Sequence, residues 1–218
     1  MFADQSHASC DEPSTSIAFF DVTVRTMTAA PARRVVFHGV TGSGKTSAAH
    51  AYAAVAGVPA FSADDDLGWL PGWTGRPIED QYRIAAGIAA QDRWVLDSAY
   101  SSWRDIILAR AELIVFLDYP RWFSLGRLTR RTIRRIIRRE LVCNGNIETL
   151  GRALTKDSII LWHFRSLTSK REAIERIQAD PSMPPVLSFE RPRELAVWLG
   201  AGAPAPPLSN ASRRDTEE

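Results

Sequence analysis

Cysteine and histidine are scarce in this chain of 218 residues. The two cysteines, Cys10 and Cys143, are too few for a disulfide framework and have no metal-ligand spacing. The four histidines form no cluster of metal ligands, and no Gly-x-Ser-x-Gly element or Cys/His pair indicates a covalent nucleophile. The sequence therefore favours neither a metal-cluster protein nor covalent catalysis, and its cysteine usage fits a reducing cytosol.

Long apolar runs and an excess of one charge are also missing. No stretch of about 18 apolar residues occurs, and the N-terminus does not show a charged region followed by a long apolar one. The net charge is only +2, so the whole molecule has no strong field for nucleic acid or membranes. We expect a cytoplasmic protein without a membrane partner. Any affinity for DNA would come from a local cluster of basic residues and not from the net charge.

One motif is complete in this background, the phosphate-binding pattern G-x-x-x-x-G-K-[ST]. An apolar run, Val35–Phe37, precedes it as the strand that such a loop needs, and 48–55 follows as the helix. The chain has three lysines against 24 arginines, yet a lysine stands at the required position. The motif consists of Gly39, Val40, Thr41, Gly42, Ser43, Gly44, Lys45 and Thr46.

The residue types of this loop predict ATP and Mg²⁺ as cofactors. Its glycines let backbone N–H groups face a polyphosphate, and the following helix adds the positive end of its dipole. Lys45 can reach the β- and γ-phosphates, and the Thr46 hydroxyl is placed to hold Mg²⁺.

Alternating apolar and helical segments predict the fold. The apolar runs are nearly continuous, as in parallel strands that are covered on both faces. We expect an α/β, three-layer P-loop NTPase fold of the nucleotide-kinase type, with about five parallel strands and helices on both faces. The expected strands are 34–38, 60–63, 94–97, 113–118 and 185–189. The expected helices are 46–56, 78–90, 103–111, 120–139, 159–178 and 192–199.

The composition of the ends predicts the domain limits. Residues 1–32 are rich in Ser, Thr, Asp, Ala and Pro, and we expect them to be poorly ordered; because Met27 lies just upstream of the domain, the first 26 residues can reflect an upstream start codon. We expect one domain at 33–200, with an arginine-rich lid region at about 121–156 that includes a loop from Val142 to Lys156. The Pro-rich, charged tail 201–218 is expected to be unfolded.

Acids at the ends of strands are the next candidates, because open parallel sheets bind ligands at the carboxyl ends of their strands. Asp97 and Asp118 each follow an apolar strand and fit the acid that helps to hold Mg²⁺. The usual strand order of small P-loop kinases favours Asp97, while Asp118 also fits the start of a helix. One member of Asp64–Asp66 could bind an acceptor hydroxyl near the γ-phosphate. The aromatic run Trp69–Trp73 fits a stacking wall or a core plug equally well.

Arginines three and four residues apart line one side of the expected helix 120–139. Arg127 and Arg131 are our candidates for lid arginines that neutralise charge on the transferred phosphoryl group. A solvated basic face and a contact with nucleic-acid phosphates are the two alternatives. Arg191, which follows the last strand, lies where adenine is commonly bound in related folds.

Several segments together resemble a bacterial family of adenylate-kinase-like P-loop proteins labelled DNA topology modulation proteins. The resemblance runs from about Arg33 to Leu199. It rests on the loop, Asp65…Leu-Pro-Gly-Trp73, Asp97-Ser-Ala-Tyr-Ser101, Leu117-Asp-Tyr-Pro-Arg-Trp122 and Glu190-Arg-Pro-Arg-Glu194. The family pattern usually has Asp-Gly-Asn-Tyr-Ser where this chain has 97–101. The resemblance implies a five-stranded kinase-like core that binds ATP and Mg²⁺, with Asp65 as the acid at the acceptor.

The leading hypothesis is a small kinase that transfers the γ-phosphoryl group of ATP to a nucleoside, nucleotide or other small acceptor. Its site residues would be Lys45, Asp65, Arg127 and Arg131 for the transfer, with Thr46 and Asp97 for Mg²⁺. The alternative is a nucleotide-dependent regulator or ATPase that binds DNA or a partner through the arginine-rich helix. The sequence names neither the acceptor nor the oligomeric state.

Overall fold

A five-stranded parallel sheet forms the centre of the protein. The computed structural model describes residues 30–149 and 159–206, with the backbone alone for 159–167. The strand order is β2-β5-β1-β6-β9, and every pairing in this sheet is parallel. Each strand falls in one of the five apolar runs of the sequence. The strands are β1 Arg34–Gly39, β2 Ala60–Phe61, β5 Trp94–Leu96, β6 Leu113–Leu117 and β9 Val186–Phe189.

The helices lie where the sequence predicts them, within one to three residues at each end. They are α1 Lys45–Ala56, α2 Ile78–Ala89, α3 Arg104–Leu108, α4 Arg121–Arg138, α6 Ile159–Ala179 and α7 Pro192–Gly200. The largest difference is α3, which ends at Leu108 where the pattern predicts a helix to 111. Main-chain N–H groups of Arg110 and Ala111 still bond back to Ile107, so the chain leaves the helix in a tight turn.

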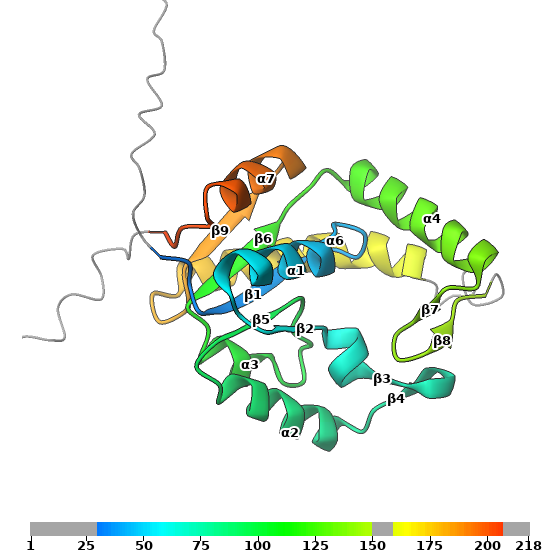
Figure 1. Ribbon diagram of the computed structural model, residues 1–218. Helices are drawn as coiled ribbons and strands as arrows, with labels where there is room; N and C mark the ends of the chain where they lie inside the picture. Colours follow the sequence, from blue (N-terminus) through cyan, green and yellow to red (C-terminus); the bar gives the residue numbers. More distant parts are fainter. Residues whose placement is uncertain (1–29, 150–158, 207–218) are drawn as a thin grey trace, which may run out of the picture.

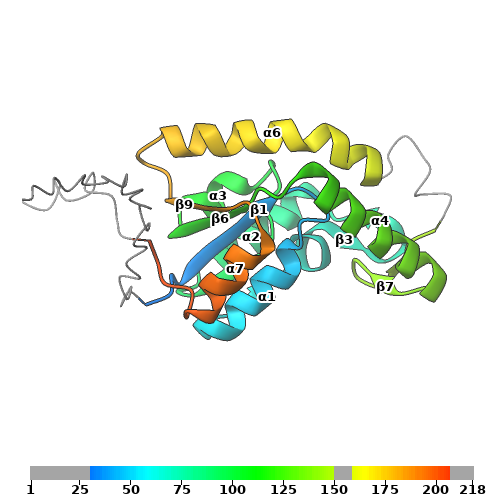
Figure 2. The ribbon, with the colours of Figure 1, turned by 90° about the horizontal axis from the view of Figure 1, so that it is seen from above.

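Two layers of helices cover the sheet and make the fold a three-layer α/β structure. Side chains of a strand alternate between its faces, so Val35 and Phe37 join the core under α1 and α7. Val36 points the other way and joins the core under α2, α3 and α6. Figure 2 shows α6 on one face of the sheet and α1 with α7 on the other. The predicted fold class is confirmed.

Short hairpins lie outside the sheet, near the end of α4 (Figure 1). One pairs β3 Trp69–Leu70 with β4 Thr74–Gly75, after a π-helical turn at Ala63–Gly68. The other pairs β7 Leu141–Val142 with β8 Asn146–Ile147. The expectation of a plain loop over 142–156 was therefore wrong at its start. Positive φ angles at Cys143, Asn144 and Gly145 turn the chain back, and strands of two residues are too short to show a periodicity.

The start of the Pro-rich tail packs on the core. Ala203 is fully buried, and the indole Nε1 of Trp198 donates to the carbonyl of Pro204 at 3.1 Å. The N–H of Ala205 donates to the carbonyl of Ala30, so both ends of the described chain meet beside α7. The remaining tail segments, 1–29 and 207–218, and the 150–158 part of the expected lid lie outside the described residues. Among the helices that the structure describes, none combines the length and the apolar character needed to cross a membrane.

Candidate active site

The phosphate loop links the carboxyl end of β1 to α1 and is tightly packed by α4. Gly42 and Gly44 have φ angles of +86° and +93°, which disfavour any residue with a Cβ. A Cβ on Gly42 would lie 2.3 Å from the carbonyl oxygen of Ser124 in α4. A Cβ on Gly44 would lie 2.8 Å from Nη2 of Arg127. The glycines of the motif thus let α4 and its arginine approach the loop backbone closely.

Lys45 is the first residue of α1, and its side chain folds over the loop. Its Nζ donates to the carbonyl of Val40 at 2.9 Å, and the Ser43 hydroxyl donates to the same oxygen at 2.8 Å. Burial lowers the pKa of Lys45 to about 8; the charge of Lys170 also lowers it, while Asp97 and Asp64 act in the opposite direction. No ion pair with a described carboxylate holds this ammonium, which suits it to a polyphosphate.

The structure joins Thr46 to Asp97, the favoured one of the two strand-end acids. The Thr46 hydroxyl donates to Asp97 Oδ2 at 2.6 Å, and Asp97 Oδ1 accepts the N–H of Ala63 at 2.8 Å. Burial raises the pKa of Asp97, and the two hydrogen bonds oppose that shift. Asp118 instead forms an ion pair with Arg171 of α6 at 2.8 Å. Both acids flank β1, but only Asp97 faces the loop threonine.

A hydroxyl and a carboxylate oxygen are ligands that Mg²⁺ accepts. The described residues contain no group of three or more Asp, Glu, His or Cys side chains suited to a metal. Mg²⁺ at Thr46 and Asp97 would therefore take its other ligands from phosphate oxygens and water, which is its habit in nucleotide sites. The donor set fits the predicted ion.

The three consecutive acids have different surroundings. Asp66 caps its own turn, because its Oδ2 accepts the N–H of Ser62 at 2.7 Å. Asp65 lies against the β7–β8 hairpin, where its Oδ1 accepts the N–H of Asn144 at 3.2 Å. Asp64 accepts the hydroxyl of Tyr100, and its charge acts on Lys45 and Asp97. Among these three acids, Asp64 is the one whose charge acts on the pKa of Lys45, and it lies one residue before Asp65, the predicted acid.

Tyr100 is a site residue that reasoning from the sequence missed. Burial, and next the charge of Asp64, raise the pKa of its hydroxyl well above the ordinary value, so it remains a hydrogen-bond donor to the carboxylate. Its ring packs on Trp103 with 5.4 Å between the ring centroids. The signal was present, because Tyr100 lies in the 97–101 segment that carries the family resemblance.

Both predicted lid arginines lie on the side of α4 that faces the loop. Arg127 reaches Gly44, and its guanidinium lies 5.6 Å from the centroid of the Phe123 ring. Arg131 is half-buried, and its buried Nε has no hydrogen-bond partner. Burial lowers the pKa of Arg131, and its charge acts on Lys45. The next arginine on this side, Arg135, forms an ion pair with Glu148 at 2.9 Å, so its charge is already paired with a carboxylate.

The aromatic run contacts the β7–β8 hairpin, and Arg191 lies at the start of α7. Trp69 and Trp73 pack edge to face at 5.6 Å, and Trp73 Nε1 donates to the carbonyl of Ile147 in β8. Trp73 therefore helps to hold the two hairpins together. Arg191 is exposed at the start of α7, where its main-chain N–H donates to Glu194 at 3.1 Å. No described contact joins Arg191 to the phosphate loop.

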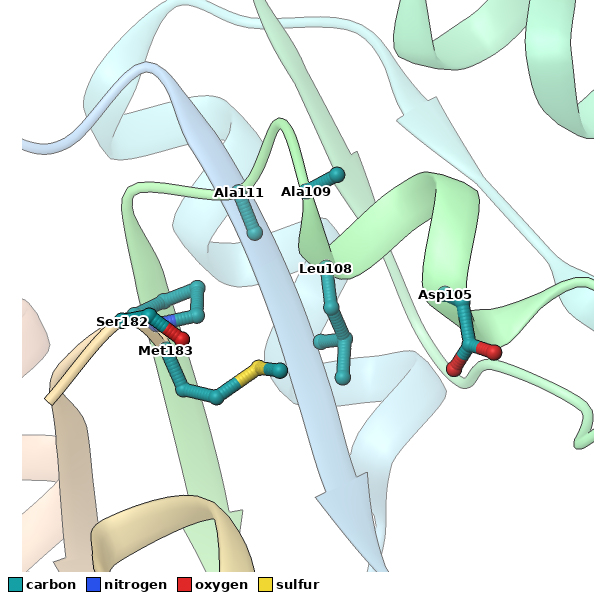
Figure 3. A pocket seen from close by; sticks show the side chains of 7 residues that line it. Asp105, Leu108, Ala109, Ala111, Ser182 and Met183 are labelled. Carbon is teal, nitrogen blue, oxygen red and sulfur yellow. The ribbon is translucent and has the colours of Figure 1, made fainter. Parts of the chain in front are cut away.

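Figure 3 shows a hollow that is separate from this site. It is lined by Leu108 and Ala111, which precede β6, and by Ser182–Pro184, which precede β9. Because these segments lead into the amino ends of their strands, the hollow lies at the opposite end of the strands from the phosphate loop, which follows the carboxyl end of β1.

The order β2-β5-β1-β6-β9, the two helical layers and the G-x-x-x-x-G-K-T loop between β1 and α1 define a P-loop NTPase of the nucleotide-kinase-like fold. No protein-family model matches the chain, and a comparison with curated proteins also gives no match.

Solved structures with a similar fold include small kinases. A gluconokinase from Sinorhizobium meliloti 1021 is 19% identical with a TM-score of 0.44, over 78% of this chain and 89% of its own. A shikimate kinase from Acinetobacter baumannii, in complex with shikimate, is 14% identical with a TM-score of 0.47, over 76% and 88%. A deoxyadenosine kinase from M. mycoides with bound dCTP is 8% identical with a TM-score of 0.41, over 76% and 96%. Likeness at this level concerns the fold alone, so the function is argued from this chain's own residues.

Proposed function

We propose that this protein is a small kinase that transfers the γ-phosphoryl group of ATP to a hydroxyl or phosphate of a small acceptor. The observation that carries the proposal is the position of Asp64. The turn that carries Asp64 is anchored beside Lys45, Thr46 and Asp97, our candidate donor residues, because the N–H of Ala63 donates to Asp97. The hydroxyl of Tyr100 donates to the Asp64 carboxylate and orients it. Hydrolysis of ATP would need only a positioned water. A carboxylate held in this way can instead receive the proton of a hydroxyl group on the acceptor molecule.

The loop residues Gly39–Thr46 would bind the phosphates of ATP through their N–H groups. Lys45 would exchange the Val40 carbonyl for the β- and γ-phosphates, and Thr46 and Asp97 would hold Mg²⁺. The ion, when bound, neutralises charge on the phosphate oxygens. Arg191 is our candidate for a contact with the base, because it follows the last strand of the sheet.

Arg127 and Arg131 would bind oxygens of the γ-phosphoryl group as it moves. Arg127 already lies against the loop backbone, and the buried Nε of Arg131 has a free donor. Charge on the equatorial oxygens of the transferred group is what such arginines stabilise.

We propose that Asp64 is the acid that binds the acceptor group. The family resemblance favours its neighbour Asp65 for the same role. The acceptor oxygen would form the new P–O bond while the bond to the β-phosphate oxygen breaks, and a hydroxyl proton would leave to the carboxylate. Tyr100 would keep this carboxylate aimed toward Lys45.

The second candidate is a nucleotide-dependent regulator, as the DNA topology modulation label suggests. It is favoured by Arg130 and Arg138, which lie exposed on α4 and form no ion pair with any described residue. In that case ATP would bind and turn over slowly, and occupancy would change the affinity for DNA or a partner.

Release of ADP in a coupled assay separates the two candidates. The kinase proposal predicts that at least one member of a panel of nucleosides, nucleotides and sugar acids raises ADP formation above the rate in water. If none does, while ATP changes DNA retention with a steep salt dependence, the regulator is supported and the kinase proposal fails.

A further inference from the structure

Two cationic side chains outside the phosphate loop point toward the same face of the sheet. On α6, Lys170 lies one and two turns before Ile174 and Ile177, which pack in the core on that face. On α3, Arg104 lies three and four residues before Ile107 and Leu108, which pack in the same core. Helical periodicity therefore places Arg104 and Lys170 on the core-facing sides of their helices, where each continues an apolar stripe with a positive charge.

Neither cation has a partner among the residues that the structure describes. Lys170 and Arg104 are half-buried, yet no hydrogen bond or ion pair to a described residue holds either of them. By contrast, Arg171, the next residue on α6, forms an ion pair with Asp118. A half-buried cation without a partner is unfavourable unless a ligand neutralises it.

A buried histidine directly precedes the phosphate loop on the same face of the sheet. His38 is the residue before Gly39 on β1, is only 4% exposed, and its Nε2 has no hydrogen-bond partner. Burial lowers its pKa well below the ordinary value, and the charges of Lys170, Lys45 and Arg104 lower it further. The pKa of Lys170 is lowered by burial and by Arg104. The charges of Lys170, Lys45 and Arg104 thus all act on His38, which agrees with the placement of Arg104 and Lys170 on the core-facing sides of α3 and α6.

The basic region formed by Arg104, Lys170 and His38 lies beside the donor site and is distinct from it. His38 is on the face of the sheet that α2, α3 and α6 cover, and Tyr100 and Trp103 lead into α3 on that face. Asp64 accepts the Tyr100 hydroxyl, so the proposed acceptor carboxylate lies at the same end of the molecule. The basic region and Asp64 thus lie on the acceptor side of the phosphate loop.

We infer that Arg104 and Lys170 bind an anionic group, a phosphate or a carboxylate, of the phosphoryl acceptor, with His38 as a further hydrogen-bonding group. The inference rests on the proposed kinase function and names the substrate class of that same site. An unmodified nucleoside or a neutral sugar would leave both cations unpaired, which is a strong penalty against such acceptors.

The first test measures anion binding without any turnover. Full-length protein is saturated with Mg²⁺ and a non-hydrolysable ATP analogue, so that the phosphate loop is filled, and is then titrated calorimetrically with inorganic phosphate or with acetate. We expect wild type to bind at least one of these anions and Arg104→Gln and Lys170→Gln to bind it about tenfold more weakly. Preference for phosphate would indicate a phosphorylated acceptor, and preference for acetate a carboxylate.

Matched controls keep this result interpretable. Arg110→Gln and Arg176→Gln remove exposed arginines near the ends of α3 and α6 and should bind the anion as wild type does. Affinity for the ATP analogue shows that each variant is folded, and Arg104→Lys and Lys170→Arg should restore part of the binding. If wild type binds neither anion, or if the Gln variants bind as tightly as the controls, the inference is wrong.

The second test compares acceptors in pairs that differ by one anionic group, such as a nucleoside with its 5′-monophosphate and glucitol with gluconate. We expect ADP formation with anionic members, and a loss of about tenfold in kcat/KM for Arg104→Gln and Lys170→Gln, mainly through KM. If neutral and anionic members react equally well, the inference fails and the kinase function stands. If the anion binds as predicted but no acceptor raises ADP formation, the kinase function fails and the anion site stands.

Discussion

Asp97 has two structural partners, and this sets what its replacement would do. One carboxylate oxygen accepts the Thr46 hydroxyl, and the other accepts the main-chain N–H of Ala63, which begins the π-helical turn. The same side chain therefore positions Thr46, the proposed Mg²⁺ ligand, and anchors the turn that carries Asp64.

Replacing Asp97 by Asn should separate the effect of its hydrogen bonds from the effect of its negative charge. The amide can still bond to one of the two partners, but it removes a negative charge beside Mg²⁺. We expect kcat/KM to fall by about a hundredfold and the Mg²⁺ concentration for half-maximal rate to rise. Asp118→Asn is the matched control, because Asp118 pairs with Arg171 and should leave the Mg²⁺ dependence unchanged. Equal effects of the two changes would contradict the assignment of the metal acid.

Asp64 and Asp65 give a second comparison between adjacent residues. Asp64→Asn should lower kcat by about a hundredfold or more at unchanged ATP affinity, since it removes the proton acceptor. Asp65→Asn loses only an exposed bond to the Asn144 N–H and should stay within about threefold of wild type. Steady-state kinetics with a saturating acceptor give both values, and the reverse order would return the role to Asp65.

His38 makes the stability of the protein depend on pH. In the unfolded chain its pKa is near 6.5, whereas burial, followed by the charges of Lys170, Lys45 and Arg104, holds it well below that value in the folded protein. Below pH 6.5 the unfolded state therefore binds a proton that the folded state does not, and the free energy of unfolding falls as pH falls. The slope from this one group approaches about 1.4 kcal/mol per pH unit at most.

Urea unfolding between pH 7 and pH 5 would test this. His38→Gln should show a shallower loss of stability than wild type, while the exposed His50 provides the control His50→Gln, which should keep the wild-type slope. A slope that His38→Gln leaves unchanged would show that other groups cause the acid sensitivity.

At the scale of elements, the amide side chain of Asn146 is one of the groups that hold the two small hairpins together. Asn146 is buried; its Oδ1 accepts the N–H of Trp73 at 2.6 Å, and its Nδ2 donates to the carbonyls of Leu70 and Cys143. The hairpin that follows α4 is thereby docked on the hairpin that follows Asp64. Because α4 also packs against the loop glycines, contacts along the chain of elements connect the phosphate loop, α4 and the two hairpins.

Asn146→Ala should loosen this docking without unfolding the sheet. It removes the hydrogen bonds of the Asn146 side chain to the N–H of Trp73 and to two carbonyls, a local cost of about 1–3 kcal/mol. Hydrogen exchange should speed up in 69–75 and 141–147, while the sheet strands exchange as before. Ile147→Ala, which shortens an exposed neighbour, should leave exchange near wild type, and uniform acceleration across the sheet would contradict a local role.

The elements differ in how well the sequence predicted them, for a physical reason. Strands such as β6 are continuous apolar runs, and helices such as α4 repeat over several turns, so local pattern and burial agree. The hairpins have strands of two residues, and their stability comes from Asn146 and Trp73, which act across about 70 residues of sequence. The local sequence pattern does not predict contacts between residues so far apart in the chain.

For the whole molecule, the donor half of the site was predictable and the acceptor half was not. Gly39–Thr46 form a continuous motif, and Asp97 follows from strand order. The difference between Asp64 and Asp65 depends on which carboxylate meets Tyr100, and the basic region depends on α3 and α6 covering the same face. Those relations arise from tertiary packing, so no local pattern in the sequence distinguishes Arg104 and Lys170 from other cations.

The most direct test of the whole account follows the phosphoryl group itself. ATP labelled at the γ-phosphate is incubated with Mg²⁺, the acceptor panel and either wild type or Lys45→Ala, and the labelled products are separated. The account predicts that wild type places the label in an organic phosphate, and that Lys45→Ala folds normally but forms this product at least about a hundredfold more slowly. Label that appears only as inorganic phosphate, at a rate that no acceptor changes, or transfer that Lys45→Ala leaves intact, would contradict it.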